Sequence, residues 1–555
     1  MRKILSIFAF FTIISGYSQV APDKYFIEFT DKSGTPYSID KPREFLSQRA
    51  IDRRNREYLA ITEDDLPVNP QYINQIAATG VQVLTVTKWF NGVTVYTPMP
   101  SLIDSIEKLP FVKKVIKNKG ISFSSSPVVD KFRIENLVTE PLQPSTVPLN
   151  PSNGFRYGVS YNQIHMLNGD GLHSMGYRGN GKVIAILDGG FYKVDKFHAF
   201  DSLWARGQIL GTRDFVTPGG NIFIGASHGM SVLSTMGGNI PDSLIGTAPM
   251  AKYWLLRSED VNSEYIIEEY NWVSAAEFAD SVGADVINSS LGYSTFNDSS
   301  QNHTCDDMNG YTTPVSRGAN MAGQRGIAVV CSAGNEGGSE YWHCVSAPAD
   351  ATEVLAIAAV DSSRNYAWFS SHGRIDTTYV KPNVAAQGED AIIYSTFGRI
   401  STGSGTSFSS PIMAGLVACL WQAMPQIDHF HLLRAIEKSA DHYATPDTLT
   451  GYGIPNFVKA LQILSVNDKK TEALTIWPNP FSNDIFLHIH SGMAGEGEVF
   501  FYDEMGKIVF QKNIQLTSGE NNIRIDGLDD LHPGFYILHF LSSGVSASVS
   551  LVKIK

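Results

Sequence analysis

Cysteine is scarce in this sequence. Only 4 of the 555 residues are cysteines, too few for a disulfide framework in a chain of this length. Cys331 follows an apolar run and Cys419 lies within another, so both are expected to be buried thiols. Cys305 and Cys344 lie in polar, loop-like surroundings and could pair with each other, but the sequence alone does not decide that pairing.

Positive charge is also sparse. The formal net charge is −12, and no group of lysines and arginines is large enough to bind a phosphate backbone. We therefore expect no nucleic-acid partner. With 43% apolar and 18% charged residues, the chain has ordinary globular composition and length enough for several domains.

Long apolar runs are confined to the N-terminus. Arg2 and Lys3 precede the apolar residues 4–14, and small residues follow up to Ser18. This run is too short to span a bilayer with ease, so residues 1–18 are predicted to be a secretory signal, with a membrane anchor as the alternative. No later stretch approaches the roughly 20 apolar residues of a transmembrane helix, so we expect a mature protein that is secreted or attached to the cell surface.

Residues 19–120 alternate between strand and helix patterns. Strand patterns cover 24–29, 81–86, 92–96 and 111–116, and helix patterns cover 42–54, 71–78 and 101–108. This alternation predicts a small α+β domain, in which no catalytic group of residues is visible. Residues 121–152, which are rich in serine and proline, are predicted to be a linker.

The section at 153–465 has the pattern of a doubly wound α/β domain. Residues 183–187 form a continuous apolar run, which is typical of a strand that is buried on both faces of a mostly parallel sheet. Similar runs at 284–288 and 326–330 each follow a helical pattern. Ligands bind such sheets at the carboxyl ends of the strands.

The last section, residues 471–555, contains short alternating strands separated by turn residues. Patterns of this kind at 484–489, 497–502 and 522–525 predict a small β-sandwich.

Three polar residues stand out in the α/β section. Asp188 ends the first apolar strand, His228 lies between glycine-rich turns at the start of a helical pattern, and Ser407 precedes the apolar run 412–421. Alone, Ser407 could be a helix N-cap, and a single histidine is more often structural. Together, in the chain order Asp, His, Ser, they match the order of the subtilisin triad.

The sequence resembles the subtilisin-like serine proteases, or subtilases, over roughly residues 153–464. The matching stretches are residues 184–190, 227–229, 286–292, 332–336, 405–411 and 451–453. No Gly-x-Ser-x-Gly elbow surrounds Ser407, which disfavours an esterase or lipase that uses the same three residue types.

The resemblance implies a role for each residue of the triad. Ser407 would attack the peptide carbonyl, His228 would accept and return its proton, and Asp188 would orient the imidazole. Asn335, otherwise a turn residue after a strand, would donate its side-chain amide to the oxyanion.

The resemblance also implies a substrate-binding edge and a pocket. Ser290, Leu291 and Gly292 would pair with an extended substrate, and Ala333 and Gly334 would form another wall of the pocket. Because Leu291 is apolar and the other residues are small, we expect a preference for a hydrophobic side chain before the cleaved bond. Calcium is frequent in the family and is a possible cofactor here, but no Asp-rich loop has the spacing of Ca²⁺ ligands, so no metal-binding residue is assigned.

The flanking sections resemble known companions of such proteases. Residues 19–120 look like a propeptide that blocks the active site until it is removed, and residues 471–555 are similar to the sorting domains of the type IX secretion system. The resulting hypothesis is a secreted serine endopeptidase of protein or peptide substrates, made as a zymogen. The alternative is a catalytically silent surface protein that binds peptides.

Overall fold

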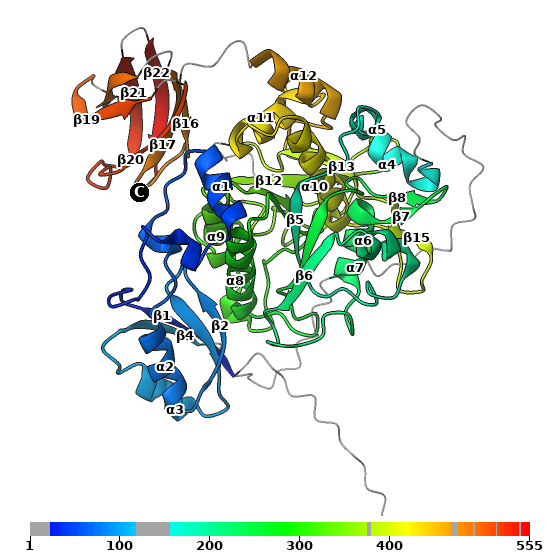
Figure 1. Ribbon diagram of the computed structural model, residues 1–555, viewed down its shortest axis with the longest axis horizontal. Coiled ribbons are helices and arrows are strands. Elements are labelled where there is room, and N and C mark those ends of the chain that lie inside the picture. The colour runs from blue at the N-terminus through cyan, green and yellow to red at the C-terminus, as the bar shows by residue number, and fades with distance from the viewer. Residues whose placement is uncertain are drawn as a thin grey trace, which may run out of the picture.

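The computed structural model describes residues 23–117, 132, 156–373, 379–467, 474–491, 494–504, 506–517, 519–542 and 545–554. The predicted signal at 1–18 lies outside these residues, as does the predicted linker at 121–152 except for Phe132. Three domains follow one another along the chain (Figure 1). Among the described residues, no helix combines the length and the apolar character that a membrane crossing needs.

The N-terminal domain is an antiparallel sheet in the order β2-β3-β1-β4, as expected for an α+β unit. Its elements are β1 (Lys24–Phe29), α1 (Gln48–Arg56), α2 (Pro70–Ala78), β2 (Gln82–Thr87), β3 (Gly92–Tyr96), α3 (Pro100–Ile106) and β4 (Val112–Lys117). Ile76 of α2 and Ile103 of α3 pack against Val93 and Val95 of β3 in one core. On the other face of the sheet, Phe26 stacks on Tyr270 of the next domain, with ring centroids 4.1 Å apart.

The helix predicted at 42–54 is shorter at its N-terminal end. A single 3₁₀ turn covers Pro42–Glu44, and α1 begins only at Gln48. Ser47 has an extended backbone and its side chain accepts a hydrogen bond from the N–H of Ala50, which makes it the N-cap. A serine that caps the backbone in this way marks the start of a helix. The charged residues before Ser47 fit the helical pattern, which is why the sequence predicts a longer helix.

The central domain is built on a parallel seven-stranded sheet in the order β13-β12-β11-β10-β5-β9-β6, which confirms the predicted α/β class. The strands are β5 (Val183–Asp188), β6 (Ile209–Asp214), β9 (Lys252–Arg257), β10 (Val286–Ser289), β11 (Ala328–Ser332), β12 (Val354–Val360) and β13 (Val384–Gln387).

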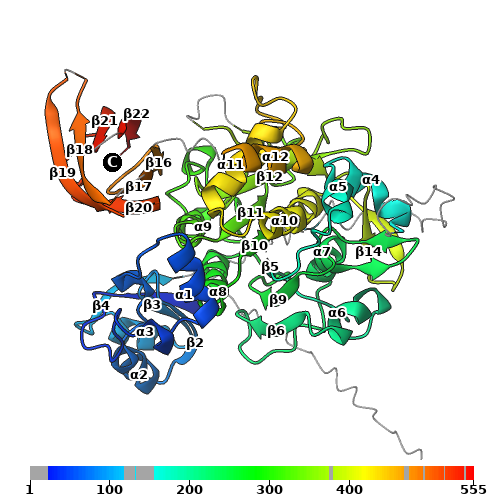
Figure 2. The same ribbon diagram turned by 45° about the horizontal axis from the view of Figure 1, so that its top comes forward.

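Helices cover both faces of this sheet (Figures 1 and 2). Ile184 and Ile186 of β5 belong to the core with α7 (His228–Gly237) and α10 (Thr406–Ala423). Ala185 and Leu187 point the other way, into the core with α8 (Ile267–Val282) and α9 (Pro314–Gly323). The alternation of side chains along a strand buried on both faces explains why the run 183–187 is apolar without a break.

The other helices of this domain are α4 (Tyr161–His165), α5 (Gly169–Ser174), α6 (Asp201–Ala205), α11 (His429–Ser439) and α12 (Phe457–Asn467). Two short antiparallel pairs are formed by β7 (Asn239–Ile240) with β8 (Leu244–Ile245) and by β14 (Ala391–Tyr394) with β15 (Ile400–Gly403). Cys305 and Cys344 form a disulfide, while Cys331 and Cys419 are buried free thiols.

The C-terminal domain is a β-sandwich, as predicted. One antiparallel sheet contains β16 (Thr475–Trp477), β17 (Ile485–Ser491) and β20 (Gly519–Ile525). The other contains β18 (Gly495–Tyr502), β19 (Ile508–Leu516), β21 (Gly534–Ser542) and β22 (Val545–Lys553). Leu487 of the first sheet and Phe501 and Leu538 of the second share one core.

Candidate active site

Asp188 and His228 meet at the carboxyl end of β5. Asp188 is the last residue of this strand and His228 is the first residue of α7. The Nδ1 atom of His228 lies 2.8 Å from Oδ1 of the fully buried Asp188 carboxylate. A carboxylate accepts hydrogen bonds, so the proton of the neutral imidazole is held on Nδ1, and the lone pair is on Nε2.

This close approach depends on Gly229, the second residue of α7. A Cβ atom at this position would lie 2.7 Å from the carbonyl oxygen of Gly190 and 2.9 Å from Cβ of Asp188. Any larger residue would therefore push the start of α7 away from the end of β5. The glycine after His228 in the sequence thus has a packing role at the site.

Ser407 is the second residue of α10, and its Oγ donates a hydrogen bond to the carbonyl oxygen of Ser290 at 3.3 Å. Pro411, four residues later, has no N–H to bond the carbonyl of Ser407 within the helix. Ser290 satisfies that carbonyl instead, because its Oγ donates to it at 2.9 Å. Because Pro411 leaves the carbonyl of Ser407 without a partner in the helix, the hydrogen bond from Ser290 connects the first turn of α10 to the segment after β10.

Asn335 follows β11 and is held by the same helix. Its Oδ1 accepts hydrogen bonds from the backbone N–H of Thr406 at 2.8 Å and from Oγ1 of Thr406 at 2.9 Å. Because both donors hold the oxygen, the Nδ2 amide is directed away from Thr406. Neither bond could be predicted from the sequence, in which Thr406 was only the neighbour of Ser407.

A pocket opens beside these groups. Its lining includes Ser290, Leu291, Gly292, Gly334, Asn335 and Ser407. Gly334 has a φ of +111°, and a Cβ atom there would lie 2.7 Å from Oγ of Ser346, so this wall requires glycine. Ala333 lies behind the wall: it is fully buried, and its N–H bonds the carbonyl of Ile357 at 3.0 Å.

Glu336 also lines the pocket, although the sequence suggested no role for it. Removal from water raises the pKa of its carboxyl group above the usual value, and this effect is opposed by hydrogen bonds from Oγ of Ser371 and the N–H of Asn335. The only signal in the sequence was its place next to Asn335 in a motif. Glu336 adds a carboxyl group to the lining of the pocket.

Phe132, from the predicted linker, covers the site. Its ring stacks on the imidazole of His228, with centroids 4.0 Å apart and an angle of 25° between the planes, and it lines the same pocket. Phe408, the neighbour of Ser407, lies with its ring centroid 6.2 Å from that of His228. The imidazole of His228 is therefore in contact with the ring of Phe132 and close to the ring of Phe408 at the start of α10.

Two groups of described side chains have donors suited to a metal ion. Glu259, Glu264 and Glu268 are buried near the pocket, which Glu259 lines. The other group lies between the central and C-terminal domains.

Comparisons with known proteins assign a family to each domain. Residues 24–131 match the peptidase S8 propeptide domain of Bacteroidota, residues 179–453 match the subtilase family, and residues 475–554 match the secretion system C-terminal sorting domain.

Curated relatives are similar over about half to two thirds of the chain. Subtilisin E of Bacillus subtilis (strain 168) is 27% identical over 352 residues, which cover 63% of this chain and 83% of the relative. The thermophilic serine proteinase of Bacillus sp. (strain AK1) is 31% identical over 284 residues, covering 51% of this chain and 62% of that protein. Subtilisin of Bacillus pumilus is 28% identical over 309 residues, covering 55% of this chain and 98% of the relative.

Proposed function

This chain carries a catalytic domain of the subtilase family of serine proteases, and on that premise we propose that it is an endopeptidase with Ser407 as its nucleophile. We assign His228 as the general base and Asp188 as the residue that orients it. The observation that carries this proposal is the 2.8 Å contact between Asp188 and His228, at the same end of the sheet as Ser407 and Asn335.

In the first half of the reaction, Oγ of Ser407 forms a bond to the carbonyl carbon of the substrate. Its proton passes to Nε2 of His228, which carries the lone pair because Asp188 holds the other proton on Nδ1. The imidazolium formed in this step is stabilised by the buried carboxylate of Asp188.

Negative charge develops on the substrate oxygen as this bond forms. We assign the Nδ2 amide of Asn335 and the backbone N–H of Ser407 as its hydrogen-bond donors, helped by the N-terminus of α10. The C–N bond then breaks, and the amine leaves with the proton from His228. Water, activated by the same imidazole, releases the acyl group from Ser407 and restores the enzyme.

Replacing Asn335 with leucine is expected to lower kcat about 100- to 1000-fold with little change in KM, because the amide binds charge that is present mainly in the transition state. The measurement is steady-state cleavage of a peptide that is blocked at both ends. A loss that appears in KM alone would contradict the proposed role of Asn335.

We propose that the substrate extends along Ser290, Leu291 and Gly292 and places one side chain in the adjoining pocket. Leu291 and the small wall residues favour an apolar side chain. Glu336 adds a carboxyl group, so a positive side chain should be tolerated better than a negative one.

A panel of peptides blocked at both ends tests both the internal cleavage and this pocket. With only the residue before the cleaved bond varied, we expect kcat/KM to follow the order Phe, then Lys, then Glu. Glu336→Gln should lower the Lys-to-Glu ratio about tenfold, since an ion pair between Glu336 and a lysine side chain in the pocket would contribute on the order of 1 kcal/mol. The matched control is Glu340→Gln, which removes the same charge from an exposed position four residues away.

Fastest cleavage after Glu would contradict the proposed pocket. Failure to cut any peptide blocked at both ends, with activity on free-ended peptides, would show an exopeptidase instead.

We also propose that the N-terminal domain inhibits its own catalytic domain. It is a peptidase S8 propeptide domain by family, and Phe132, next to the end of the matched region, lies on His228. We propose boundaries at 19–120 and 153–465, with the maturation cut within 121–152.

Buried charges join the two domains. Asp280 of α8 is fully buried and binds Arg54 at 2.9 Å and Lys88 at 3.0 Å, both from the N-terminal domain. Arg53 also binds Asp280. Removing one of these side chains would leave the opposite charge buried and unpaired, at a cost of about 3–5 kcal/mol, so these pairs specify how the two domains dock.

The C-terminal sorting domain marks the protein as secreted or held at the cell surface. We propose that the type IX secretion machinery recognises residues 471–555.

The glutamate group near the pocket fits calcium poorly. Ca²⁺ takes about six to eight oxygen ligands. Here Glu259 Oε2 accepts a hydrogen bond from Tyr293, and both carboxylate oxygens of Glu268 accept backbone N–H groups. No step of the mechanism is therefore assigned to calcium.

A further inference from the structure

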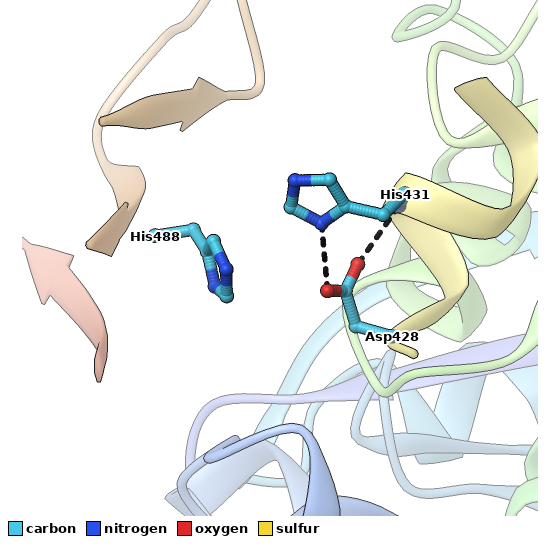
Figure 3. A group of neighbouring side chains, drawn as sticks. All are labelled: Asp428, His431 and His488. Atoms are coloured by element: carbon cyan, nitrogen blue, oxygen red, sulfur yellow. Dashed lines mark hydrogen bonds and ion pairs between the residues drawn. The ribbon is translucent and has the colours of Figure 1, made fainter. Parts of the chain in front are cut away.

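A group of metal-ligating side chains lies where the catalytic and C-terminal domains meet. Asp428 and His431 belong to the start of α11, and His488 belongs to β17 (Figure 3). One ring nitrogen of each histidine and one carboxylate oxygen of Asp428 all lie within 4.8 Å of one another. We call these three residues the interdomain cluster.

Asp428 is held in place by His431. Its Oδ1 caps α11 by accepting the backbone N–H of His431 at 2.9 Å, and its Oδ2 lies 2.7 Å from Nδ1 of the same residue. An aspartate is ordinarily ionised at neutral pH, so the cluster offers a carboxylate whose two oxygens both face donors of His431.

His488 is oriented by a neighbour on β20. Its Nδ1 lies 2.6 Å from Oδ1 of Asn522, and Nδ2 of the same amide donates to the backbone carbonyl of Glu57. The second bond fixes which end of the amide faces His488, so Nδ1 of His488 is the donor and the lone pair is on Nε2. Histidines that bind metals are commonly oriented in this way by a hydrogen bond from their other nitrogen.

The two domains already contact each other around the cluster. The ring of Phe430 on α11 stacks on Trp477 of β16, with centroids 5.3 Å apart. The hydroxyl of Tyr311 donates to the carbonyl oxygen of Pro480 at 3.1 Å. The side chains from α11 and β17 are therefore brought together by an interface that does not depend on a metal.

We propose that the interdomain cluster binds one Zn²⁺ ion, which joins the sorting domain to the catalytic domain. Two imidazoles and one carboxylate form a donor set that suits zinc, and water would complete four-coordination. Ligand atoms on tetrahedral zinc lie about 3.3 Å apart, so small side-chain rotations would close the present spacing. In binding, the metal takes the place of the proton between Nδ1 of His431 and Asp428, and the neutral ring then carries its proton on Nε2.

The test is a calorimetric titration of Zn²⁺ into the full chain, purified without a polyhistidine tag and carrying Ser407→Ala so that it does not cut itself. We expect one equivalent of zinc to bind and to raise Tm. His488→Ala should lower the zinc affinity by at least about 100-fold. Loss of a residue that only orients a ligand costs up to about 100-fold, and loss of a ligand itself should cost no less.

A second variant separates metal binding from folding. Asp428→Ser keeps a side-chain oxygen that can cap α11 but removes the carboxylate, so the helix should persist while zinc affinity falls. The matched control is His442→Ala, an exposed histidine of the same domain, which should change zinc affinity by less than twofold.

Two results would overturn the proposal. One is the absence of zinc binding by the parent chain. The other is an affinity that stays the same in His488→Ala and Asp428→Ser, with both variants keeping the Tm of the parent chain in the presence of a chelator.

Discussion

Ser407→Ala is expected to lower kcat for a blocked peptide by about 10⁶-fold, because no other group would form the acyl-enzyme. Labelling by a fluorophosphonate, which reacts with an activated serine, should disappear with it. The precursor should also accumulate uncut if the protein matures itself. The measurements are steady-state kinetics, labelling, and mass spectrometry of the secreted protein.

Ser409→Ala provides the matched control. This serine lies in the same buried turn of α10, and its Oγ donates to the carbonyl oxygen of Thr406 at 3.1 Å. Its loss should leave kcat within a few-fold of the parent value. Persistent labelling of Ser407→Ala would place the nucleophile elsewhere, and a parent protein that neither labels nor cleaves would favour the silent peptide-binding alternative.

Asp188→Asn is expected to lower kcat by about 10⁴-fold while the fold is retained. The amide of asparagine can donate to Nδ1 of His228, which stabilises the tautomer with its proton on Nε2. That tautomer cannot accept the proton of Ser407, and the imidazolium would also lose its buried counter-charge. Kinetics with the blocked peptide and thermal unfolding of the same samples measure the two effects.

Asp195→Asn is the comparison for this change, because it removes the same charge from a partly exposed position shortly after β5. It should leave kcat nearly unchanged. If Asp188→Asn kept more than about a tenth of the parent kcat, the proposed orienting role of Asp188 would be wrong.

The central sheet was predictable because its strands are buried on both faces. Residues 183–187 alternate between two cores, so every position is apolar and the run stands out. The start of α1 was harder to predict, since Ser47 is a single polar residue among many. Charged and apolar residues continue with helical spacing on both sides of Ser47. The pattern therefore did not show that the capping bond of Ser47 marks the start of the helix.

The candidate site was predictable in its chemistry but not in its contacts. Short sequence motifs mark all three residues of the proposed triad. Asp188 ends an apolar strand, and His228 and Ser407 lie close to glycines at the start of a helix. Phe132 lies in a stretch of linker composition, and nothing local indicates that its ring reaches His228. The interdomain cluster joins Asp428 to a residue of another domain, and only folding brings such distant positions together.

Glu57 of the N-terminal domain contacts both of the other domains. Its carboxylate lies 2.7 Å from Nδ1 of His429 on the catalytic domain, and its backbone carbonyl accepts the amide of Asn522 on the sorting domain. If the N-terminal domain is removed as we propose, the sorting domain loses this hydrogen bond and keeps its contacts with α11 and Tyr311. Removal of the proposed inhibitor would therefore also weaken the attachment of the C-terminal sorting domain.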